Sequence, residues 1–471
     1  MAAERYKWLF NVDNNYTWYE PSDDTLIEVL YELSNFNLAK LDQDVLGTIY
    51  EEYIDKVDKR QKGQYYTPRE IVEFIWDRVG FTNSMAFFWH IEGRRRPKFI
   101  FDPATGSGGF LVEAARRIRE QSGINWNDFQ DLLDVRTAIL SYIFGSEISV
   151  FPYYITEVNL LIQLTPVVKR MIELKKGLKE SLPLGIVPVN SLSLYNPEST
   201  LLPEEEHKFD NIRDLLPLES QKKVVFEKIK KRFDRKFSYC CANPPYIGEK
   251  GNKELFRSTR QRFPYWDEFY QGKMDYLYFF IILGLSKLRN PGTKAPGGKL
   301  GFITTAYWPT ADGASKLRKY ILGNAKIKEM VFFEDVKIFE YAKGQHNMVF
   351  ILEKCAGKDR KEERDGNRIK IVRILAKPQE ILGNTIREKL GFLTGHIEKY
   401  IGKNKWQDDH IKVYWSTIRQ GELPPDGGPW SDLYVLPESK VLLSHLEQEA
   451  EPLKNVCIII QGIVSGADRV T

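Results

Sequence analysis

The four residues Asn243-Pro244-Pro245-Tyr246 have the types and order needed to bind a flat, nitrogen-bearing group. They follow directly on the apolar run 237–242, which predicts a buried strand. A polar acceptor, two rigid prolines and an aromatic ring at a strand end form a slot for an amide or amidine-like group. The alternative is a proline-rich turn that only closes the strand.

Two acceptors in this slot could bind both hydrogens of one amino group. The Asn243 side-chain oxygen can accept one N–H, and the Pro244 carbonyl, which Pro245 holds extended, can accept the other. Tyr246 offers a face on which a flat ring can stack, although a tyrosine packed in the core is the alternative. The candidate catalytic residues are therefore Asn243, Pro244, Pro245 and Tyr246.

A second candidate site is the glycine turn after the apolar run 99–101. The turn leads into a predicted helix over 111–119, so a ligand could lie against the backbone at a helix start. A third glycine at the dinucleotide spacing would fall on Leu111, and no Gly-Lys-Ser/Thr follows, so neither pyrophosphate fingerprint is met. A carboxylate at the strand end suits a cationic group such as the ammonium of a methionine, which favours S-adenosylmethionine. The candidate cofactor-binding residues here are Asp102, Ala104, Gly106 and Gly108.

Three further positions are candidates because of where they stand on the predicted elements. Glu147 closes the next predicted strand, where a carboxylate can accept both hydroxyls of a ribose; a surface charge is the alternative. Asn190 ends the third strand and could contact an adenine edge, or could be an ordinary turn residue. The segment 63–68 precedes a helix, with Thr67 expected as N-cap and Pro68 at the first helical position, and capping alone would explain both.

Short apolar runs alternate with helical stretches from residue 98 onward, which is typical of a doubly wound α/β sheet. We therefore expect a Rossmann-like, mostly parallel sheet. The last two runs are joined by a segment with Gly344, Gln345 and Asn347, and they predict an antiparallel hairpin at the sheet edge. The predicted strands cover residues 99–101, 142–144, 185–189, 237–241, 300–303, 331–333 and 348–352.

The chain divides into three predicted regions. Residues 1–60 form a predicted helical region, because apolar positions recur at helical spacing between 23 and 57. Residues 61–420 form the predicted catalytic domain, with a charged insertion at 196–236. Pro and Gly are frequent at 420–430, so residues 421–471 are predicted to hold a linker and the start of a second, truncated domain.

The composition favours ordinary globular folding, with 471 residues, 42% hydrophobic content and a formal charge of +4. Four cysteines form neither a disulfide framework nor a metal-ligand spacing, so we expect no metal and a reducing cytoplasm. No signal-type core stands at the N-terminus, and the longest apolar stretch, near 276–285, is too short to span a bilayer. Secretion and membrane insertion are therefore not expected.

With these pieces in order, the chain resembles the N6-adenine DNA methyltransferases of restriction-modification systems, namely type I modification subunits and fused type IIG-like enzymes of the Asn-Pro-Pro-Tyr class. The resemblance covers about residues 25–355, and three motifs carry it, at 64–68, 102–111 and 243–246. It implies that Tyr66 and Thr67 hold the methionine end of S-adenosylmethionine, while Asp102 binds its amino group and Glu147 its ribose. Asn190 stands where the family usually has an aspartate.

The resemblance implies methyl transfer from S-adenosylmethionine to the N6 of an adenine flipped out of double-stranded DNA, in a restriction-modification or phage-defence system. It also implies a target-recognition domain after the catalytic one, and residues 461–466 look like its opening. A specificity subunit, or fused target-recognition and nuclease domains, would be partners. We find no convincing nuclease pair of the Pro-Asp and Glu-x-Lys kind in residues 1–60.

Other classes of protein stay open at this point. An RNA or protein-glutamine N-methyltransferase would fit the same slot, because an amide nitrogen is also flat. A non-catalytic DNA-binding component of a defence complex would keep the fold, but intact Asn243, Tyr246 and Asp102 favour catalysis. A nicotinamide dehydrogenase is less favoured because the glycine spacing fails.

Overall fold

The computed structural model describes most of the central part of the chain. The described residues are 22–35, 67–82, 88–91, 94–174, 184–195, 233–292, 295–334, 336, 338–339, 346–374, 388, 391–392, 405–407, 412–435, 437–451 and 453–457. The chain separates into two compact units, Met1–Pro429 and Trp430–Thr471, and each is described by itself. Every candidate site residue belongs to the first unit, and Tyr66 lies outside the described residues.

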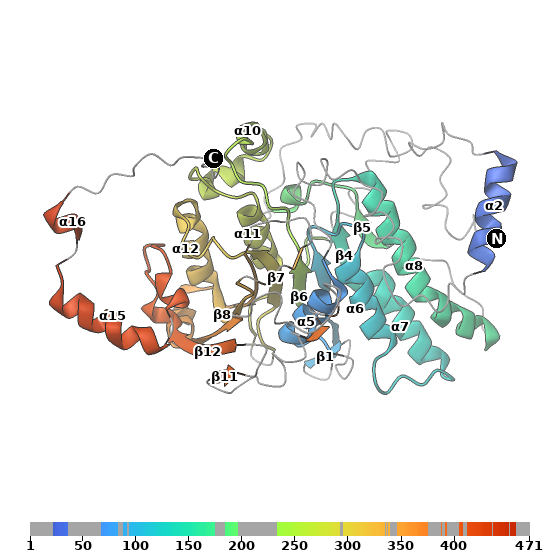
Figure 1. The fold of residues 1–471 in the computed structure, drawn as a ribbon. Coiled ribbons are helices and arrows are strands. Elements are labelled where there is room, and N and C mark those ends of the chain that lie inside the picture. The colour runs from blue at the N-terminus through green and yellow to red at the C-terminus, as the bar shows by residue number, and fades with distance from the viewer. Residues whose placement is uncertain are drawn as a thin grey trace. The chain divides into compact units, whose positions relative to one another are not determined.

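The first unit is built on a ten-stranded sheet (Figure 1). Its strands are β3 (Ile100–Asp102), β4 (Ile143–Ser146), β5 (Gly185–Val187), β6 (Tyr239–Ala242), β7 (Lys299–Thr305), β8 (Ala325–Phe332), β9 (Asn347–Lys354), β10 (Arg368–Ile374), β11 (Lys405–Gln407) and β12 (Lys412–Arg419). The spatial order is β11-β12-β10-β8-β9-β7-β6-β3-β4-β5. Strands β5, β4, β3, β6 and β7 are parallel, and β9 is antiparallel to both of its neighbours. A separate ribbon pairs β1 (Phe88–Ile91) with β2 (Arg94–Pro97).

The helices of this unit fall mainly between the strands in sequence. They are α2 (Asp23–Ser34), α5 (Arg69–Val79), α6 (Gly109–Arg119), α7 (Phe129–Tyr142), α8 (Val150–Glu173), α10 (Lys253–Arg262), α11 (Leu277–Lys287), α12 (Ser315–Asn324) and α13 (Lys361–Asp365). Short 3-10 turns are η2 (Ser191–Leu194), η3 (Pro264–Phe269), η4 (Asp312–Ala314), η5 (Lys358–Arg360) and η7 (Gln420–Glu422).

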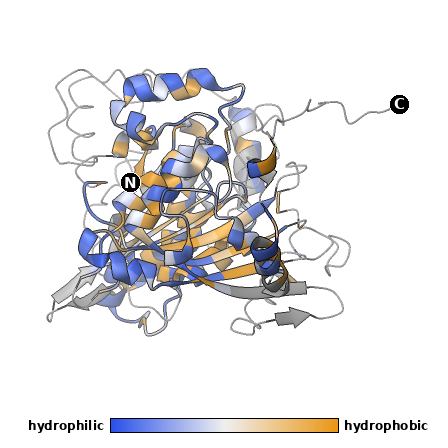
Figure 2. Ribbon diagram, turned by 90° about the vertical axis from the view of Figure 1, so that its left-hand side faces the viewer, coloured by the Kyte–Doolittle hydropathy of each residue, from blue (hydrophilic) through white to orange (hydrophobic). Residues whose placement is uncertain are grey.

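Helices cover both faces of the sheet, as two neighbouring residues of β7 show. A Cβ built on Gly301 would lie within 2.8 Å of side-chain carbons of Ile75 and Val79 in α5. The side chain of Leu300 lies instead against Gly284 of α11. Consecutive side chains of a strand point to opposite faces, so α5 and α11 pack on opposite sides. The sheet is buried between two helix layers, and its strands are largely apolar in Figure 2.

This architecture confirms the predicted doubly wound, mostly parallel α/β fold. A strand is present at each of the seven predicted places, and the last two, β8 and β9, pair antiparallel as expected. Their predicted place at the sheet edge is wrong, because β10, β12 and β11 continue the sheet beyond β8. These three strands were not predicted, although residues 368–374 alternate between exposed and buried positions as a strand at a sheet surface does.

Several predicted boundaries are wrong by a few residues, among them the start of β8 at Ala325. Helix α5 begins at Arg69 and its N-cap is Pro68, so Thr67 is not the N-cap. Pro68 fills this place because its extended ψ of 140° lets its carbonyl accept the first helical N–H groups. Helix α7 continues through Tyr142, which moves the next strand to Ile143–Ser146. Strand β5 ends at Val187, because Pro188 has no N–H for the ladder.

The predicted regions are described in part. Helix α2 lies in the predicted helical region, and the rest of residues 1–60 is outside the described residues. Of the predicted insertion, 196–232 is also outside them, while Phe233 packs on Phe101 and Phe144 at centroid distances of 5.8 and 5.3 Å. The division at 60 and 420 stays a prediction.

The predicted linker near 420–430 packs on the first unit over most of its length. The buried Gln420 side chain donates to the Ala325 carbonyl at 2.8 Å, and Arg318 donates to the Gly427 carbonyl at 2.8 Å. The second unit contains η8 (Ser431–Tyr434), α15 (Pro437–Glu449) and α16 (Leu453–Val456). Residues 461–466 lie outside the described residues, so the start of a target-recognition domain stays a prediction. Among the helices that are described, none has the length and apolar character to cross a bilayer.

Candidate active site

Four candidate residues follow the carboxyl ends of four adjacent parallel strands. Asp102 ends β3, and Glu147 comes directly after β4. Asn243 comes directly after β6, on the other side of β3, and Asn190 follows β5. Neighbouring strands lie about 4.8 Å apart. Asn243, the candidate catalytic residue, therefore lies at the same edge of the sheet as the candidate cofactor carboxylates Asp102 and Glu147. Ligands of open α/β sheets bind at this edge.

Asp102 is fully buried and only half satisfied. Its Oδ1 accepts a hydrogen bond from the backbone N–H of Ala104 at 2.9 Å, whereas its Oδ2 has no hydrogen-bond partner in the described structure. Burial raises the pKa of Asp102 to about 8; the charge of Glu147 raises it too, and the Ala104 N–H opposes both. A buried carboxylate oxygen without a donor is what a cationic ligand group would satisfy.

The glycine turn after Asp102 needs glycine for two different reasons. Gly106 and Gly108 have φ of +55° and +98°, in the left-handed region that glycine favours. A Cβ on Gly108 would lie 3.0 Å from Thr156, so this glycine also allows α8 to approach. A Cβ on Gly106 would meet no described residue within 4 Å, so the described part of the chain leaves space beside this glycine.

Helix α8 supports the turn through two side chains that the sequence analysis did not identify. Thr156 donates its hydroxyl to the Gly106 carbonyl at 2.9 Å, and Asn159 donates its amide to the Ser107 carbonyl at 3.1 Å. Both side chains are buried. Polar residues at buried positions of a long, mainly apolar helix are the sequence signal that could have indicated them.

Glu147 binds the same turn from the neighbouring strand. Its Oε2 accepts from the Gly106 N–H at 2.9 Å and its Oε1 from the Ser149 N–H at 2.8 Å. Burial raises the pKa of Glu147, while these two donors oppose the rise. The side chain is 6% exposed, so Glu147 is not a surface charge. Its contact with a ribose stays a prediction.

Asn190 has a local structural role. Its Oδ1 accepts from the Leu192 N–H at 3.1 Å and caps η2, and its side chain also hydrogen-bonds the Tyr276 hydroxyl. This is the turn-residue alternative, and it leaves the adenine contact a prediction. Thr67 is buried just before α5 and makes no capping bond, so its assigned ligand role also stays a prediction.

The loop Asn243-Pro244-Pro245-Tyr246 leaves β6 as predicted. Asn243 and Pro245 are half-buried and Pro244 is buried. Tyr246 is 9% exposed, and its hydroxyl donates to the Ile303 carbonyl of β7 at 3.1 Å. Its ring meets Phe339 edge-on at 6.2 Å, a partner that the sequence analysis did not identify. Tyr246 is thus largely packed, and base stacking on it stays a prediction.

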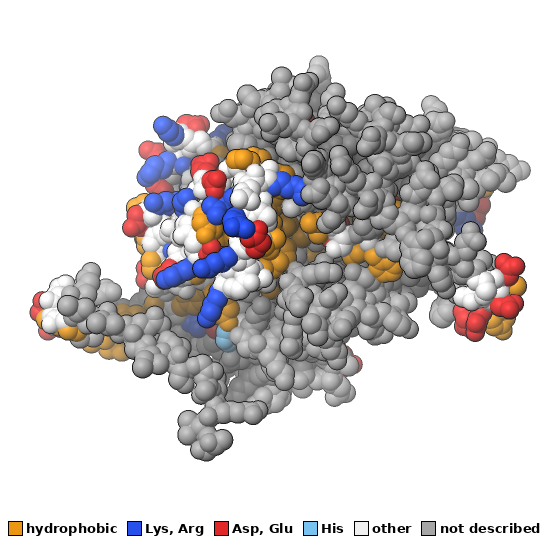
Figure 3. Space-filling model, turned by 90° about the horizontal axis from the view of Figure 1, so that it is seen from above, with side chains coloured by type: hydrophobic (Ala, Val, Ile, Leu, Met, Phe, Trp, Pro, Cys, Tyr) orange, Lys and Arg blue, Asp and Glu red, His pale blue; other side chains and the backbone are white. Residues whose placement is uncertain are grey.

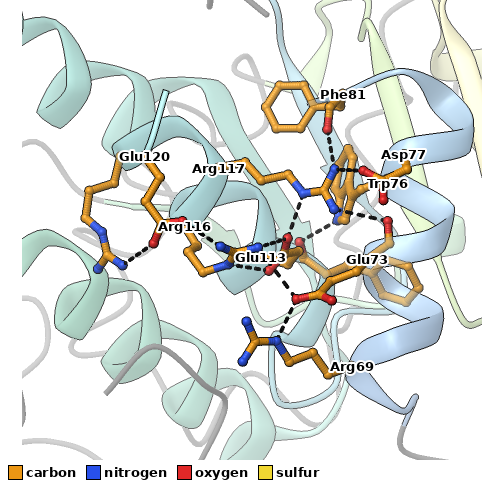
Figure 4. Close-up of polar contacts among 11 residues, drawn as sticks. Arg69, Glu73, Trp76, Asp77, Phe81, Glu113, Arg116, Arg117 and Glu120 are labelled. Carbon is orange, nitrogen blue, oxygen red and sulfur yellow. Dashed lines mark hydrogen bonds and ion pairs between the residues drawn. The ribbon is translucent and has the colours of Figure 1, made fainter. Parts of the chain in front are cut away.

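A polar network joins the helix after the 64–68 motif to the helix after the glycine turn (Figure 4). Arg117 of α6 donates to Glu113 at 2.6 Å and to the Phe81 carbonyl at 2.7 Å, and it also pairs with Asp77 of α5. Trp76 of α5 donates its indole N–H to a carbonyl of α6 at 3.0 Å. Because Arg117 is 5% exposed, this network fixes α5 against α6 from within the protein.

Two family models match the part of the chain that carries these residues. The model of N-6 DNA methylase matches residues 41–183, and that of Eco57I restriction-modification methylase matches residues 141–339. Residues 41–339, which the two matches span together, are therefore similar to the DNA methylases of restriction-modification systems. The N-6 DNA methylase match contains Asp102 and Glu147, and the Eco57I methylase match contains Asn190 and the loop at 243–246.

Curated relatives align over part of this chain. The type II methyltransferase M.HindII of Haemophilus influenzae is 28% identical over 236 residues, which are 48% of this chain and 39% of that protein. The type I restriction enzyme MjaIX methylase subunit of Methanocaldococcus jannaschii is 31% identical over 124 residues, 26% of this chain and 17% of that protein. The chain thus spans less than half the length of these curated relatives.

A solved structure of the type I restriction-modification system methyltransferase subunit from Streptococcus thermophilus superposes with a TM-score of 0.46 at 14% identity. The superposition covers 83% of this chain and 64% of the Streptococcus thermophilus chain.

Proposed function

We propose that this chain transfers a methyl group from S-adenosylmethionine to the N6 of adenine in double-stranded DNA. The observation that supports this most is the adjacency of Asn243, after β6, and the incompletely bonded Asp102, at the end of β3. An amino-group acceptor and a carboxylate for a cationic cofactor then stand at the ends of two neighbouring strands.

The residues at this edge fit S-adenosylmethionine. Asp102 Oδ2 would accept from the ammonium, the open side of Gly106 leaves room for the ligand, and Glu147 would face the ribose. The proposed cofactor-binding residues also include Tyr66, Thr67, Ala104, Gly108 and Asn190. When bound, the cofactor supplies a methyl group already activated by its sulfonium sulfur.

The protein then has to orient the target nitrogen. Adenine N6 is a weak nucleophile because its lone pair is delocalised into the ring. The Asn243 side-chain oxygen and the Pro244 carbonyl would accept its two N–H groups and favour a pyramidal nitrogen. These fixed dipoles would also stabilise the positive charge that grows on N6 as the methyl group passes from sulfur to nitrogen, by about 3 kcal/mol for each well-placed group. The carbon–sulfur bond would break to leave a neutral thioether, and the surplus N6 proton would be lost to water. Tyr246 would hold the flipped base by its ring face.

Helix α10 supports a polyanionic substrate at this edge. It follows the catalytic loop and carries four cations and one acid, and Lys253 and Arg257 are exposed. Figure 3 shows Lys and Arg side chains, interspersed with Asp and Glu, on the upper face in the half of the molecule that holds α10. Reversing both charges with Lys253→Glu and Arg257→Glu should weaken duplex binding and reduce the slope of log affinity against log salt by about 1.8. The control is the double variant Lys358→Glu with Lys361→Glu, because these lysines are remote from α10 in sequence. It should change neither the affinity for the duplex nor the salt slope.

The relatives named as type I methylase subunits support a further partner, a specificity subunit or a fused target-recognition domain. The test of the proposed reaction is incubation of labelled S-adenosylmethionine with unmethylated bacterial DNA, total RNA and a protein lysate in parallel, followed by nucleoside and amino-acid analysis. Label in N6-methyladenine of DNA supports the proposal. Label in RNA or in glutamine instead would assign the alternative N-methyltransferases, and cofactor binding with no label in any of the three, also after the specificity partner is added, would indicate a non-catalytic component.

A further inference from the structure

The residues after the catalytic loop are bound by a second segment, 274–277, that lies far from the loop in sequence. Asp275 Oδ1 accepts hydrogen bonds from the backbone N–H of Ile247 and of Leu277, both at 3.1 Å. The Tyr276 N–H donates to the Ile247 carbonyl at 2.9 Å, and the Glu249 N–H donates to the Met274 carbonyl at 2.9 Å. Both backbone polar groups of Ile247 are therefore used by Asp275 and Tyr276.

The catalytic loop has few backbone donors with which to fix itself. Pro244 and Pro245 carry no N–H, so they cannot donate to a neighbouring strand. The parallel ladder of β6 with β7 ends at Ala242, paired with Phe302. At the other end of the loop, the backbone of Ile247 is hydrogen-bonded to Asp275 and Tyr276. The position of the loop therefore depends on these two ends as well as on the hydrogen bond of the Tyr246 hydroxyl to the Ile303 carbonyl.

The same segment also reaches the cofactor side of the edge. Tyr276 is 6% exposed, and its hydroxyl lies 2.9 Å from the Thr259 hydroxyl and hydrogen-bonds the Asn190 side chain. Asn190 in turn caps η2. Asp275 and Tyr276 thus join the end of the catalytic loop to the turn that follows β5.

We propose that Asp275 is a positioning residue of the catalytic loop: it holds Ile247, so that the acceptors of Asn243 and Pro244 keep a fixed place opposite the target amino group. This inference rests on the proposed function. Asp275 acts through the loop backbone and does not itself touch substrate. A carboxylate suits this role, because one oxygen accepts two N–H groups and charge strengthens both bonds.

Hydrogen exchange of the ligand-free protein tests the contact without any substrate. In Asp275→Ala, peptides that cover 243–249 should exchange at least about tenfold faster, because the Ile247 N–H loses its acceptor. Peptides over 100–119 should be unchanged. Asp267→Ala removes a nearby carboxylate that pairs only with Arg260 among the described contacts, and it should leave 243–249 as in the wild type. Unchanged exchange at 243–249 in Asp275→Ala would overturn the proposal.

Kinetics with DNA test the consequence. Asp275→Ala should lower kcat about 100-fold, the size of effect that misplacing reacting groups by about 1 Å can have, with cofactor affinity within twofold. Asp275→Asn keeps Oδ1 as a weaker acceptor and should restore part of kcat. Equal kcat in all variants would contradict the positioning role of Asp275. If the wild type does not methylate DNA, the proposed function is rejected, but the hydrogen-exchange result still tests the contact. If exchange rises in all peptides of Asp275→Ala, that variant is destabilised as a whole. Hydrogen exchange and kinetics of Asp275→Asn then test the proposal in its place, with the same outcomes supporting or contradicting it.

Discussion

Glu147 accepts a hydrogen bond from the backbone N–H of Gly106 at 2.9 Å, across two neighbouring strands of the sheet. The carboxylate assigned to a ribose therefore also closes the glycine turn that would receive the methionine end of the cofactor. Its second oxygen accepts from the Ser149 N–H at 2.8 Å. The proposed ribose contact of Glu147 and the shape of the turn would thus be connected through one side chain.

Glu147→Gln should weaken cofactor binding about 10- to 100-fold. The amide places an NH₂ group against one of two backbone donors, and losing one hydrogen bond to a charged group costs about 1.5–3 kcal/mol. Titration calorimetry with S-adenosylmethionine measures the loss. Glu120→Gln, in a more exposed ion pair at the end of α6, is the control and should bind as the wild type. Equal affinity of Glu147→Gln would show that this carboxylate does not shape the cofactor site.

The raised pKa of Asp102 predicts proton release on cofactor binding. The pKa is about 8 in the ligand-free fold against an ordinary 3.8, so at pH 7 the group is mostly protonated. An ammonium ligand favours the carboxylate, and the proton must leave. Binding enthalpies measured at pH 7 in phosphate and in Tris should therefore differ by the ionisation heat of the buffers. Identical enthalpies in the two buffers, or the same difference in Asp102→Asn, would contradict this account.

The same shift predicts how the stability of the ligand-free protein depends on pH. Between 3.8 and about 8 the folded state holds a proton at Asp102 that the unfolded chain has lost. Folding therefore takes up a proton, and the contribution of this group to stability falls as pH rises through that window. The Tm of the wild type relative to Asp102→Asn should decrease between pH 5 and pH 8. A constant difference in Tm would place the folded pKa near its ordinary value.

Gly108→Ala and Gly123→Ala separate backbone strain from steric contact. Both glycines have positive φ, +98° and +91°, but only at Gly108 would the new Cβ lie 3.0 Å from Thr156. Left-handed backbone costs about 1–2 kcal/mol for a residue with a Cβ, and overpacking adds about 1–3 kcal/mol. Urea unfolding should show the larger loss for Gly108→Ala, with weaker cofactor binding in that variant alone. Equal losses of unfolding free energy in the two variants would contradict this prediction. They would mean that α8 can move away from the new Cβ at no cost in stability.

Arg117→Met should destabilise the protein by about 1.5–3 kcal/mol, because Glu113 keeps only Arg116 as a partner and the part-exposed Asp77 loses its ion pair. The matched control is Arg257→Met on α10, whose ion pair with Glu254 is largely exposed and should be worth less than about 1 kcal/mol. Chemical denaturation measures both. Similar small losses would show that α5 and α6 are held by apolar packing.

Much of the fold was predictable because its signals are local. The strand, carboxylate and glycine order at 99–109 and the strand before Asn243 each lie within about a dozen residues, and both were found. The contacts of Asp275 with Ile247, of Thr156 with the glycine turn and of Phe339 with Tyr246 join residues distant in sequence, and no local pattern indicates them. Pro68 was placed one position too far into its helix, because Thr and Pro are both favoured at a helix start and only the backbone angles decide.

The central claim is that Asn243 takes part in methyl transfer to adenine N6. The most direct measurement is the single-turnover rate of label transfer to unmethylated DNA for the wild type, Asn243→Ala and the control Asn252→Ala. Among the described contacts, the Asn252 side chain donates only to the Gly248 carbonyl. Cofactor affinity is measured for each protein alongside. We predict label in N6-methyladenine, a loss of at least about 100-fold in Asn243→Ala, and wild-type cofactor affinity in all three. Near-normal transfer by Asn243→Ala would contradict the claim.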